Sequence, residues 1–204
     1  MGVEYRHYLI PKPNDFMPKP EDLERFIGRA AAENWVPYDK PEVRRGGKDR
    51  ILSWRIESPA IAYPLAPVDV PPQDRTFEIQ IHVSSDFVYH ASECIDPFES
   101  SACACGTQLD YDSEDELFTD LRLPVACPVC GKAFDPSDLP AAYRHPVTGE
   151  ESLLRGGASY RFAIVIDCGK CVPSESKAVT ADPRFLELCQ TELKAPFYEV
   201  GDVY

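Results

Sequence analysis

The chain has 204 residues, eight cysteines and a formal charge of −13 from 34 acidic and 21 basic residues. Its content of 44% hydrophobic and 11% aromatic residues excludes a disordered chain, and its length suits one domain or one domain with an insertion. The negative charge argues against general affinity for nucleic acids and anionic membranes, because phosphate groups bind to basic surfaces.

The N-terminal part of the chain has the pattern strand, helix, strand, strand. Residues 3–10 alternate between the two sides of an expected strand. Pro20 is favourable as a first helical residue, and apolar residues at helical spacing after it predict an amphipathic helix over 20–35. Alternation of apolar and polar residues then predicts strands at 51–56 and 77–83.

The only concentrated basic stretch is 44–50, between the first helix and the strand at 51–56. Its pair of glycines, Gly46 and Gly47, predicts a turn. The stretch could meet an anion or an acidic partner; the other interpretation is a solvated loop.

The C-terminal part has the pattern strand, helix, strand. Alternation predicts a strand at 160–167, with Tyr160 and Phe162 on the same side. Asp182 is a favourable N-cap for a second helix, and a short strand at 197–204 follows that helix. Two helices over one mostly antiparallel sheet make an α+β sandwich, and the order invites a ferredoxin-like βαββαβ arrangement.

A long interruption at 86–157 separates the two halves of this pattern and holds five of the eight cysteines. It contains no long amphipathic helix. We therefore predict an α+β domain formed by 1–85 and 158–204, with 86–157 as an inserted subdomain.

Two cysteine pairs in the insertion, each followed by glycine, are the strongest motif in the chain. They are Cys103 with Cys105 and Cys127 with Cys130. Four thiolates can occupy the tetrahedral corners about 2.3 Å from a Zn²⁺ ion, and glycine permits the left-handed turn that brings backbone N–H groups toward sulfur. The pattern predicts one four-cysteine metal site. The alternative is four ordinary reduced cysteines, and disulfides are not expected without a secretion signal.

This pattern resembles a zinc ribbon over about residues 103–131. The Cys-Pro-Val-Cys-Gly-Lys half matches the ribbon closely, whereas the first half has Cys-x-Cys in place of Cys-x-x-Cys. Four thiolates leave no open position for water on the metal, so the ion should be structural and should help the insertion to fold. Iron in a rubredoxin-like site is the other metal that these ligands fit.

Acidic residues dominate the segment between the two cysteine pairs. They are Asp110, Asp112, Glu114, Asp115, Glu116 and Asp120, against the single base Arg122. Such a segment repels phosphate and argues against a ribbon that binds nucleic acid. It is either a solvated loop or a contact for a basic partner.

Cys168 and Cys171 form a second Cys-x-x-Cys motif directly after the strand at 160–167. The motif resembles the thioredoxin-like redox motif, but no helix is predicted before Asp182, so the helix N-terminus that activates the first thiol is missing. The pair could instead be half of a second metal site. The candidate additional ligands are Cys94, His90, His145 and Cys189.

Three of the remaining cysteines and histidines have simpler interpretations. Cys189 lies on the apolar side of the second helix and is predicted to be a core residue. His7 and His82 lie within strands and are expected to be packed or exposed sheet residues rather than ligands. No clear role is predicted for Cys94 or His90.

These patterns together predict a non-catalytic, zinc-binding protein that acts through protein–protein contacts. No catalytic or dinucleotide-binding motif is found. The alternative is a thiol or metal enzyme that uses Cys168 and Cys171. The N-terminus has no apolar signal core and no apolar run approaches the roughly 20 residues of a membrane helix, so we expect a cytoplasmic protein.

Overall fold

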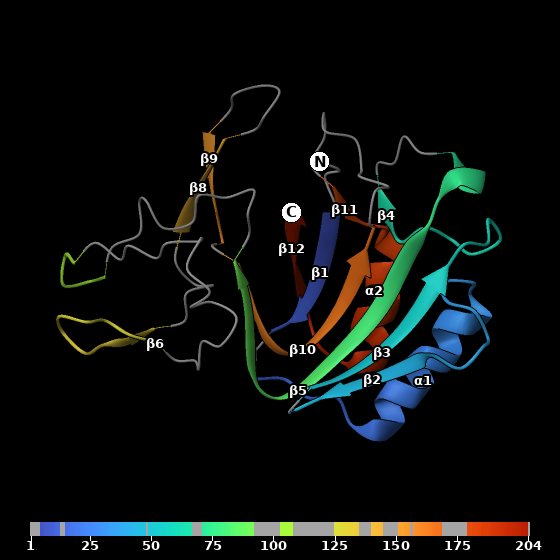
Figure 1. Cartoon of the computed structure of the whole chain (residues 1–204), viewed down its shortest axis with the longest axis horizontal. Helices are drawn as coiled ribbons and strands as arrows, with labels where there is room; N and C mark the ends of the chain where they lie inside the picture. The colour runs from blue at the N-terminus through green and yellow to red at the C-terminus, as the bar shows by residue number, and fades with distance from the viewer. Residues whose placement is uncertain are drawn as a thin grey trace.

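A six-stranded sheet with two helices packed on one face forms the main body of the described chain (Figure 1). The computed structural model describes residues 5–12, 15–47, 49–66, 71–91, 103–107, 125–134, 140–144, 151–155, 157–168 and 179–203. The strands follow the order β12-β1-β10-β5-β3-β2, and every neighbouring pair is antiparallel. They are β1 (Tyr5–Pro11), β2 (Glu42–Gly46), β3 (Asp49–Ile56), β5 (Phe77–Ala91), β10 (Gly157–Asp167) and β12 (Phe197–Val203). The helices are α1 (Pro20–Ala32) and α2 (Pro183–Leu193).

Short pairings and one 3₁₀ turn complete the described secondary structure. They are β4 (Leu65–Ala66) with β11 (Thr180–Ala181), β6 (Val125–Ala126) with β7 (Ala133–Phe134), β8 (Pro140–Arg144) with β9 (Glu151–Arg155), and the turn η1 (Pro72–Asp74). Neither helix in the described ranges has the length and apolar character needed to cross a membrane.

The connectivity confirms the predicted α+β class. Strands β1 and β5 are parallel with β10 between them, and β10 and β12 are parallel with β1 between them. Each of these pairs is a split β-α-β unit, so β12-β1-β10-β5 has the ferredoxin-like order. The β2–β3 hairpin extends the sheet beyond β5 at one edge.

Helix α1 begins at Pro20 as expected but ends earlier than predicted. It ends at Ala32, because Asn34 has a φ of 61° in the left-handed region and cannot continue a helix. Trp35, predicted as the last helical residue, lies beyond the helix and is buried. Its ring centroid is 5.1 Å from that of Phe185 on α2, so it packs where the two helices meet.

The main hydrophobic core lies between the helices and one face of the sheet. Alternate residues of β5 and β10 face it: Phe77, Ile79, Ile81, Phe162, Ile164 and Ile166. A smaller cluster contains Tyr8, Ile10, Tyr160, Ala163, Val165 and Val200. Strand β10 is therefore buried on both faces, which explains its nearly continuous apolar sequence.

The predicted alternation along β10 is wrong at Tyr160. Phe162 packs in the main core, whereas Tyr160 belongs to the smaller cluster. The reason is a shift in the pairing of β10 with β5: Phe162 lies opposite Val83, but Tyr160 lies opposite Val88. Such a bulge turns the strand and reverses the side to which its next residues point.

Two strands extend beyond the sequence-based expectation. The turn predicted at Gly46 and Gly47 is confirmed, with a φ of 53° at Gly47, and the rest of the stretch 44–50 belongs mostly to the strands of the β2–β3 hairpin. Strand β5 continues past residue 83 to Ala91, where it pairs with the beginning of β10 at Gly157. The division into 1–85 with 158–204, and 86–157, stays a prediction.

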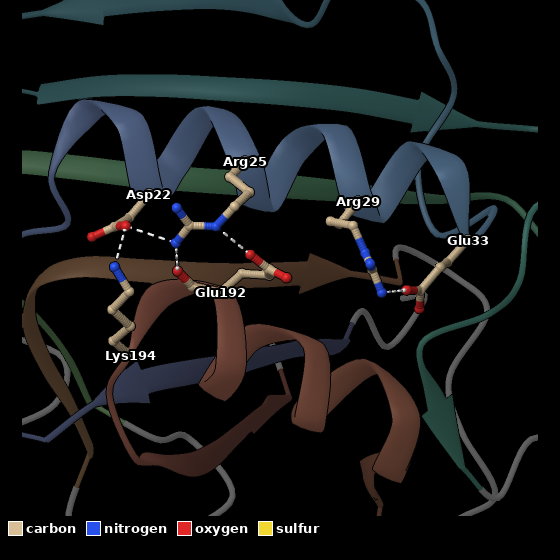
Figure 2. A network of polar contacts seen from close by, with 6 residues as sticks. All are labelled: Asp22, Arg25, Arg29, Glu33, Glu192 and Lys194. Atoms are coloured by element: carbon tan, nitrogen blue, oxygen red, sulfur yellow. Dashed lines mark hydrogen bonds and ion pairs between the residues drawn. The ribbon is translucent and has the colours of Figure 1, made fainter.

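A network of ion pairs joins the two helices (Figure 2). Arg25 on α1 donates to Asp22 one turn earlier, with 2.7 Å from Nη2 to Oδ1, and to the backbone oxygen of Glu192 on α2 at 3.0 Å. Lys194, directly after α2, donates to the same Asp22 oxygen at 2.7 Å. The hydrogen bonds from Lys194 and Arg25 lower the pKa of Asp22 below its ordinary value.

Asp22→Asn should therefore destabilise the protein at neutral pH but not in acid. A carboxyl whose folded pKa is lowered stabilises the fold fully above its ordinary pKa of 3.8, and this contribution is lost as the pH falls through the lowered value. Urea midpoints of wild type and D22N should differ at neutral pH and converge in strong acid. Glu33→Gln, which alters the exposed Arg29–Glu33 pair, is the control and should change the midpoint little. An equal difference at both pH values would contradict the role given to Asp22.

Candidate metal centre

The first cysteine pair lies in a tight turn closed by its own backbone. The N–H of Cys103 donates to the carbonyl oxygen of Thr107 at 2.8 Å, and the N–H of Gly106 donates to that of Cys103 at 2.8 Å. Gly106 has a φ of 85°, a conformation that a residue with a side chain rarely adopts. The turn places both Cys103 and Cys105 on the same short loop.

The second pair lies in the hairpin formed by β6 and β7. The N–H of Cys127 donates to the carbonyl oxygen of Lys132 at 2.9 Å, and the N–H of Gly131 donates to that of Cys127 at 2.9 Å. Gly131 has a φ of 70°, so the glycine after each pair has the left-handed role expected from the sequence. Both turns are therefore closed by a corresponding pair of backbone hydrogen bonds, and the second turn is one residue longer.

The four sulfur atoms come together in one cluster. All lie within 4.8 Å of one another; Cys103 Sγ is 3.5 Å from Cys130 Sγ, and Cys105 Sγ is 3.7 Å from Cys127 Sγ. These distances are too long for a disulfide and all four cysteines are free. A tetrahedral ion with metal–sulfur bonds of about 2.3 Å would separate the sulfurs by about 3.8 Å. The cluster could thus hold a metal ion, and it is the one such group among the described residues.

Each of these two sulfur–sulfur contacts joins a cysteine of the first turn to one of the second. An ion bound by the cluster would therefore link two chain segments that are more than 20 residues apart in the sequence. Cys103 and Cys127 are buried, whereas Cys105 and Cys130 are exposed. The site lies at the surface with one side covered.

Local hydrogen bonds favour the thiolate form of two of the four cysteines. The side chain of Thr107, 3.0 Å from Cys105 Sγ, and the Thr107 backbone lower the pKa of Cys105 to about 6. The N–H groups of Cys130 and Val129 lower the pKa of Cys127. Thiolate is the form in which cysteine binds a metal.

Ionisation of Cys130 is opposed by the neighbouring thiols. The N–H of Lys132 lowers the pKa of Cys130, but contacts with the other three thiols outweigh it and raise that pKa to about 12. Four thiolates at these distances repel one another without a positive charge between them. The donor set therefore fits a soft divalent cation.

Thr107 is a residue of this site that the sequence patterns did not identify. Its hydroxyl contacts Cys105 and its carbonyl oxygen accepts the bond that closes the turn at Cys103. A hydroxyl residue directly after Gly106 is the signal that could have identified it. The acidic residues between 110 and 120 lie outside the described residues.

Cys168 lies in the main core, and its surroundings differ from those of a reactive thiol. It has no exposed surface, and Tyr63 Oη donates to its sulfur at 2.9 Å. Its N–H donates to the carbonyl oxygen of Tyr5 at 2.8 Å, which places it on the end of the sheet. Cys171, the other half of the motif, lies outside the described residues. Reactive cysteines are partly exposed, and Cys168 is not.

The predicted core position of Cys189 is confirmed. The residue is fully buried among the main-core side chains, and burial raises the pKa of its thiol. Cys189 is not a member of the four-cysteine cluster. Cys94 and His145 lie outside the described residues, as does the side chain of His90.

The two strand histidines are packed polar residues, as expected. His7 is buried and its ring nitrogens lie 2.9 Å from Tyr5 Oη and 2.7 Å from Glu199 Oε2. Burial raises the pKa of Glu199, but hydrogen bonds from His7 and the N–H of Ala181 outweigh it, and the net pKa is lowered. This pairing joins β1 to β12 across 192 residues of sequence, and no local pattern could predict it.

His82 makes a similar set of contacts on β5. Its ring nitrogens lie 3.0 Å from Tyr160 Oη and 2.6 Å from Gln80 Oε1. Neither histidine belongs to a group of described residues that could hold a metal. Among the described residues, the four cysteines are thus the group that could hold a metal ion.

No protein-family model, no curated protein and no solved structure matches the chain.

Brief alkylation of the folded protein should leave Cys168 and Cys189 unmodified, because neither sulfur is accessible. Mass-spectrometric mapping after an iodoacetamide pulse would show this, and both residues should become modified once the protein is unfolded in guanidinium. Modification of Cys168 in the folded protein at the rate of an ordinary exposed thiol would contradict its buried position.

Proposed function

We propose that the four cysteines bind one structural Zn²⁺ ion and that the protein is non-catalytic, acting through protein–protein contacts. The observation that carries the proposal is the meeting of two glycine-containing turns that bring four thiols to nearly tetrahedral separations. The resemblance of the cysteine spacing to a zinc ribbon supports the same ion.

The number of ligands supports a structural role for the ion. Catalytic zinc sites keep a position open for water or substrate, whereas four thiolates complete the tetrahedral shell. Iron would fit the same sulfur set, and it is an outcome that metal analysis separates from zinc.

The ion would stabilise mainly the folded form of the segment that contains its ligands. A stretch of about 30 residues cannot bury enough apolar surface to fold alone and usually needs a metal or disulfides. The reduced thiols that metal binding requires are maintained in the cytoplasm, which is where we place the protein. Metal binding energy then becomes folding energy for this part of the chain.

Protein contacts fit the surface chemistry better than nucleic acid does. Val129 in the second turn has an apolar side chain, and 73% of its surface is exposed. The acidic residues between the ligand pairs disfavour a phosphate backbone. The alternative of a redox pair or second metal site at Cys168 and Cys171 gains no support from the buried position of Cys168.

Purified protein should contain about one equivalent of zinc. Cys127→Ser and Cys130→Ser should each lose most of the metal and lower the thermal midpoint, because three thiolates bind the ion more weakly than four. Cys189→Ala, which removes a thiol from the core instead, should keep the metal. Less than half an equivalent of zinc or iron, with unchanged stability of both serine variants, would contradict the proposal.

Thr107→Val should weaken zinc affinity by about tenfold, because groups that orient a metal ligand contribute on this scale. Thr107→Ser keeps the hydroxyl near Cys105 and serves as the matched control. Competition with a chromophoric chelator measures both affinities. Equal affinity of the valine and serine variants would show that the hydroxyl does not support the ligand.

A further inference from the structure

Strand β2 is an exposed sheet edge. It is the last strand in the sheet order, and β3 is its only neighbour within the described ranges (Figure 1). All five of its residues, Glu42 to Gly46, are exposed, and Val43 alone exposes 46% of its surface. An exposed edge is a template on which another extended chain can pair.

The register of the hairpin shows which backbone groups face outward. Gly46 pairs with Asp49 across the turn, and each preceding residue of β2 pairs with the next residue of β3. Antiparallel pairs alternate between hydrogen-bonded and non-hydrogen-bonded, starting from the bonded pair that closes a two-residue turn. The N–H and C=O groups of Val43 and Arg45 therefore point away from β3.

This edge is basic in a chain that is strongly acidic. Residues 39–50 contain five bases and three acids, whereas the whole chain has a charge of −13. Arg44 is engaged by Glu78 on β5, with 2.7 Å from Nη2 to Oε1. Arg45 is exposed and belongs to no ion pair in the described part of the chain. Since Glu78 offsets Arg44, the remaining four bases and three acids of 39–50 leave a net charge of +1.

The beginning of β2 also offers space for side chains of a bound segment. An open hollow of about 360 Å³ lies there, lined by Pro37, Ser53 and Trp54 and by three basic and three acidic side chains. Tyr38, which lies between the lining residues Pro37 and Asp39 in the sequence, is 80% exposed. Exposed aromatic and arginine side chains are typical anchors of protein interfaces.

We infer that β2 binds an extended, acidic segment of a partner protein as an additional strand of the sheet. Backbone groups of Val43 and Arg45 would supply the pairing, and Arg45 and Lys40 would favour carboxylates on the bound segment. The inference specifies the partner expected under the proposed function, and it does not depend on the metal. The competing explanation is that charges on β2 only prevent edge-to-edge association.

A labelled ten-residue peptide of alternating glutamate and valine tests the inference with the full-length protein. Fluorescence anisotropy should show binding that weakens as salt is added, and a peptide of alternating lysine and valine should not bind. Val43→Pro removes an outward N–H and should weaken binding by about tenfold or more, whereas Val43→Thr should have little effect. Thermal melts would establish that V43P is folded.

A second pair of variants tests the charge without altering the backbone. Arg45→Gln should weaken binding of the acidic peptide by about threefold, and Arg29→Gln on α1, with the same change in net charge, should not. No binding of the acidic peptide at millimolar concentration, equal binding of the basic peptide, or equal binding by V43P and V43T would overturn the inference. Zinc content measured on the same preparation separates the two proposals: a zinc-loaded protein that ignores the peptide contradicts only the edge inference.

Discussion

Four cysteine sulfurs within 4.8 Å of one another cannot all be ionised without a cation between them. The local structure nevertheless prepares them for ionisation, since Thr107 and backbone N–H groups lower the pKa values of Cys105 and Cys127. The pKa of Cys130 is raised instead, because the other three thiols oppose the ionisation of this one. A divalent ion would resolve this conflict, and it would tie together two turns whose described contacts with each other are those between the cysteine sulfurs.

The α+β body of the protein is stabilised by different means. Strand β10 is buried on both faces, and the two helices cover the main core and are joined by the network around Asp22 and Arg25 (Figure 2). Several polar groups of this body pair with one another: His7 with Glu199, His82 with Tyr160, and Cys168 with Tyr63. Such pairs hold strands and loops in place, and the four-cysteine cluster and the β2 edge are the surfaces where we propose that function lies.

The sequence patterns predicted both helices, the α+β class and the four cysteines that come together, because burial and metal binding each leave a periodic or spaced signature. They did not predict β2, since all of its residues are exposed and a strand without a buried side lacks alternation. They misplaced Tyr160, because a bulge depends on the pairing with β5. The burial of Cys168 could not be predicted from the sequence either. Its contact with Tyr63 spans 105 residues, and only the tertiary fold shows that the thiol is buried.

X-ray absorption spectroscopy of the purified, metal-loaded protein tests most directly whether all four cysteines bind one metal ion, because it counts the sulfur atoms around the metal and measures their distances. We predict a zinc edge with four sulfur neighbours at about 2.3 Å and no nitrogen or oxygen neighbour. A first shell that contains nitrogen or oxygen, or fewer than four sulfurs, would contradict the four-cysteine centre.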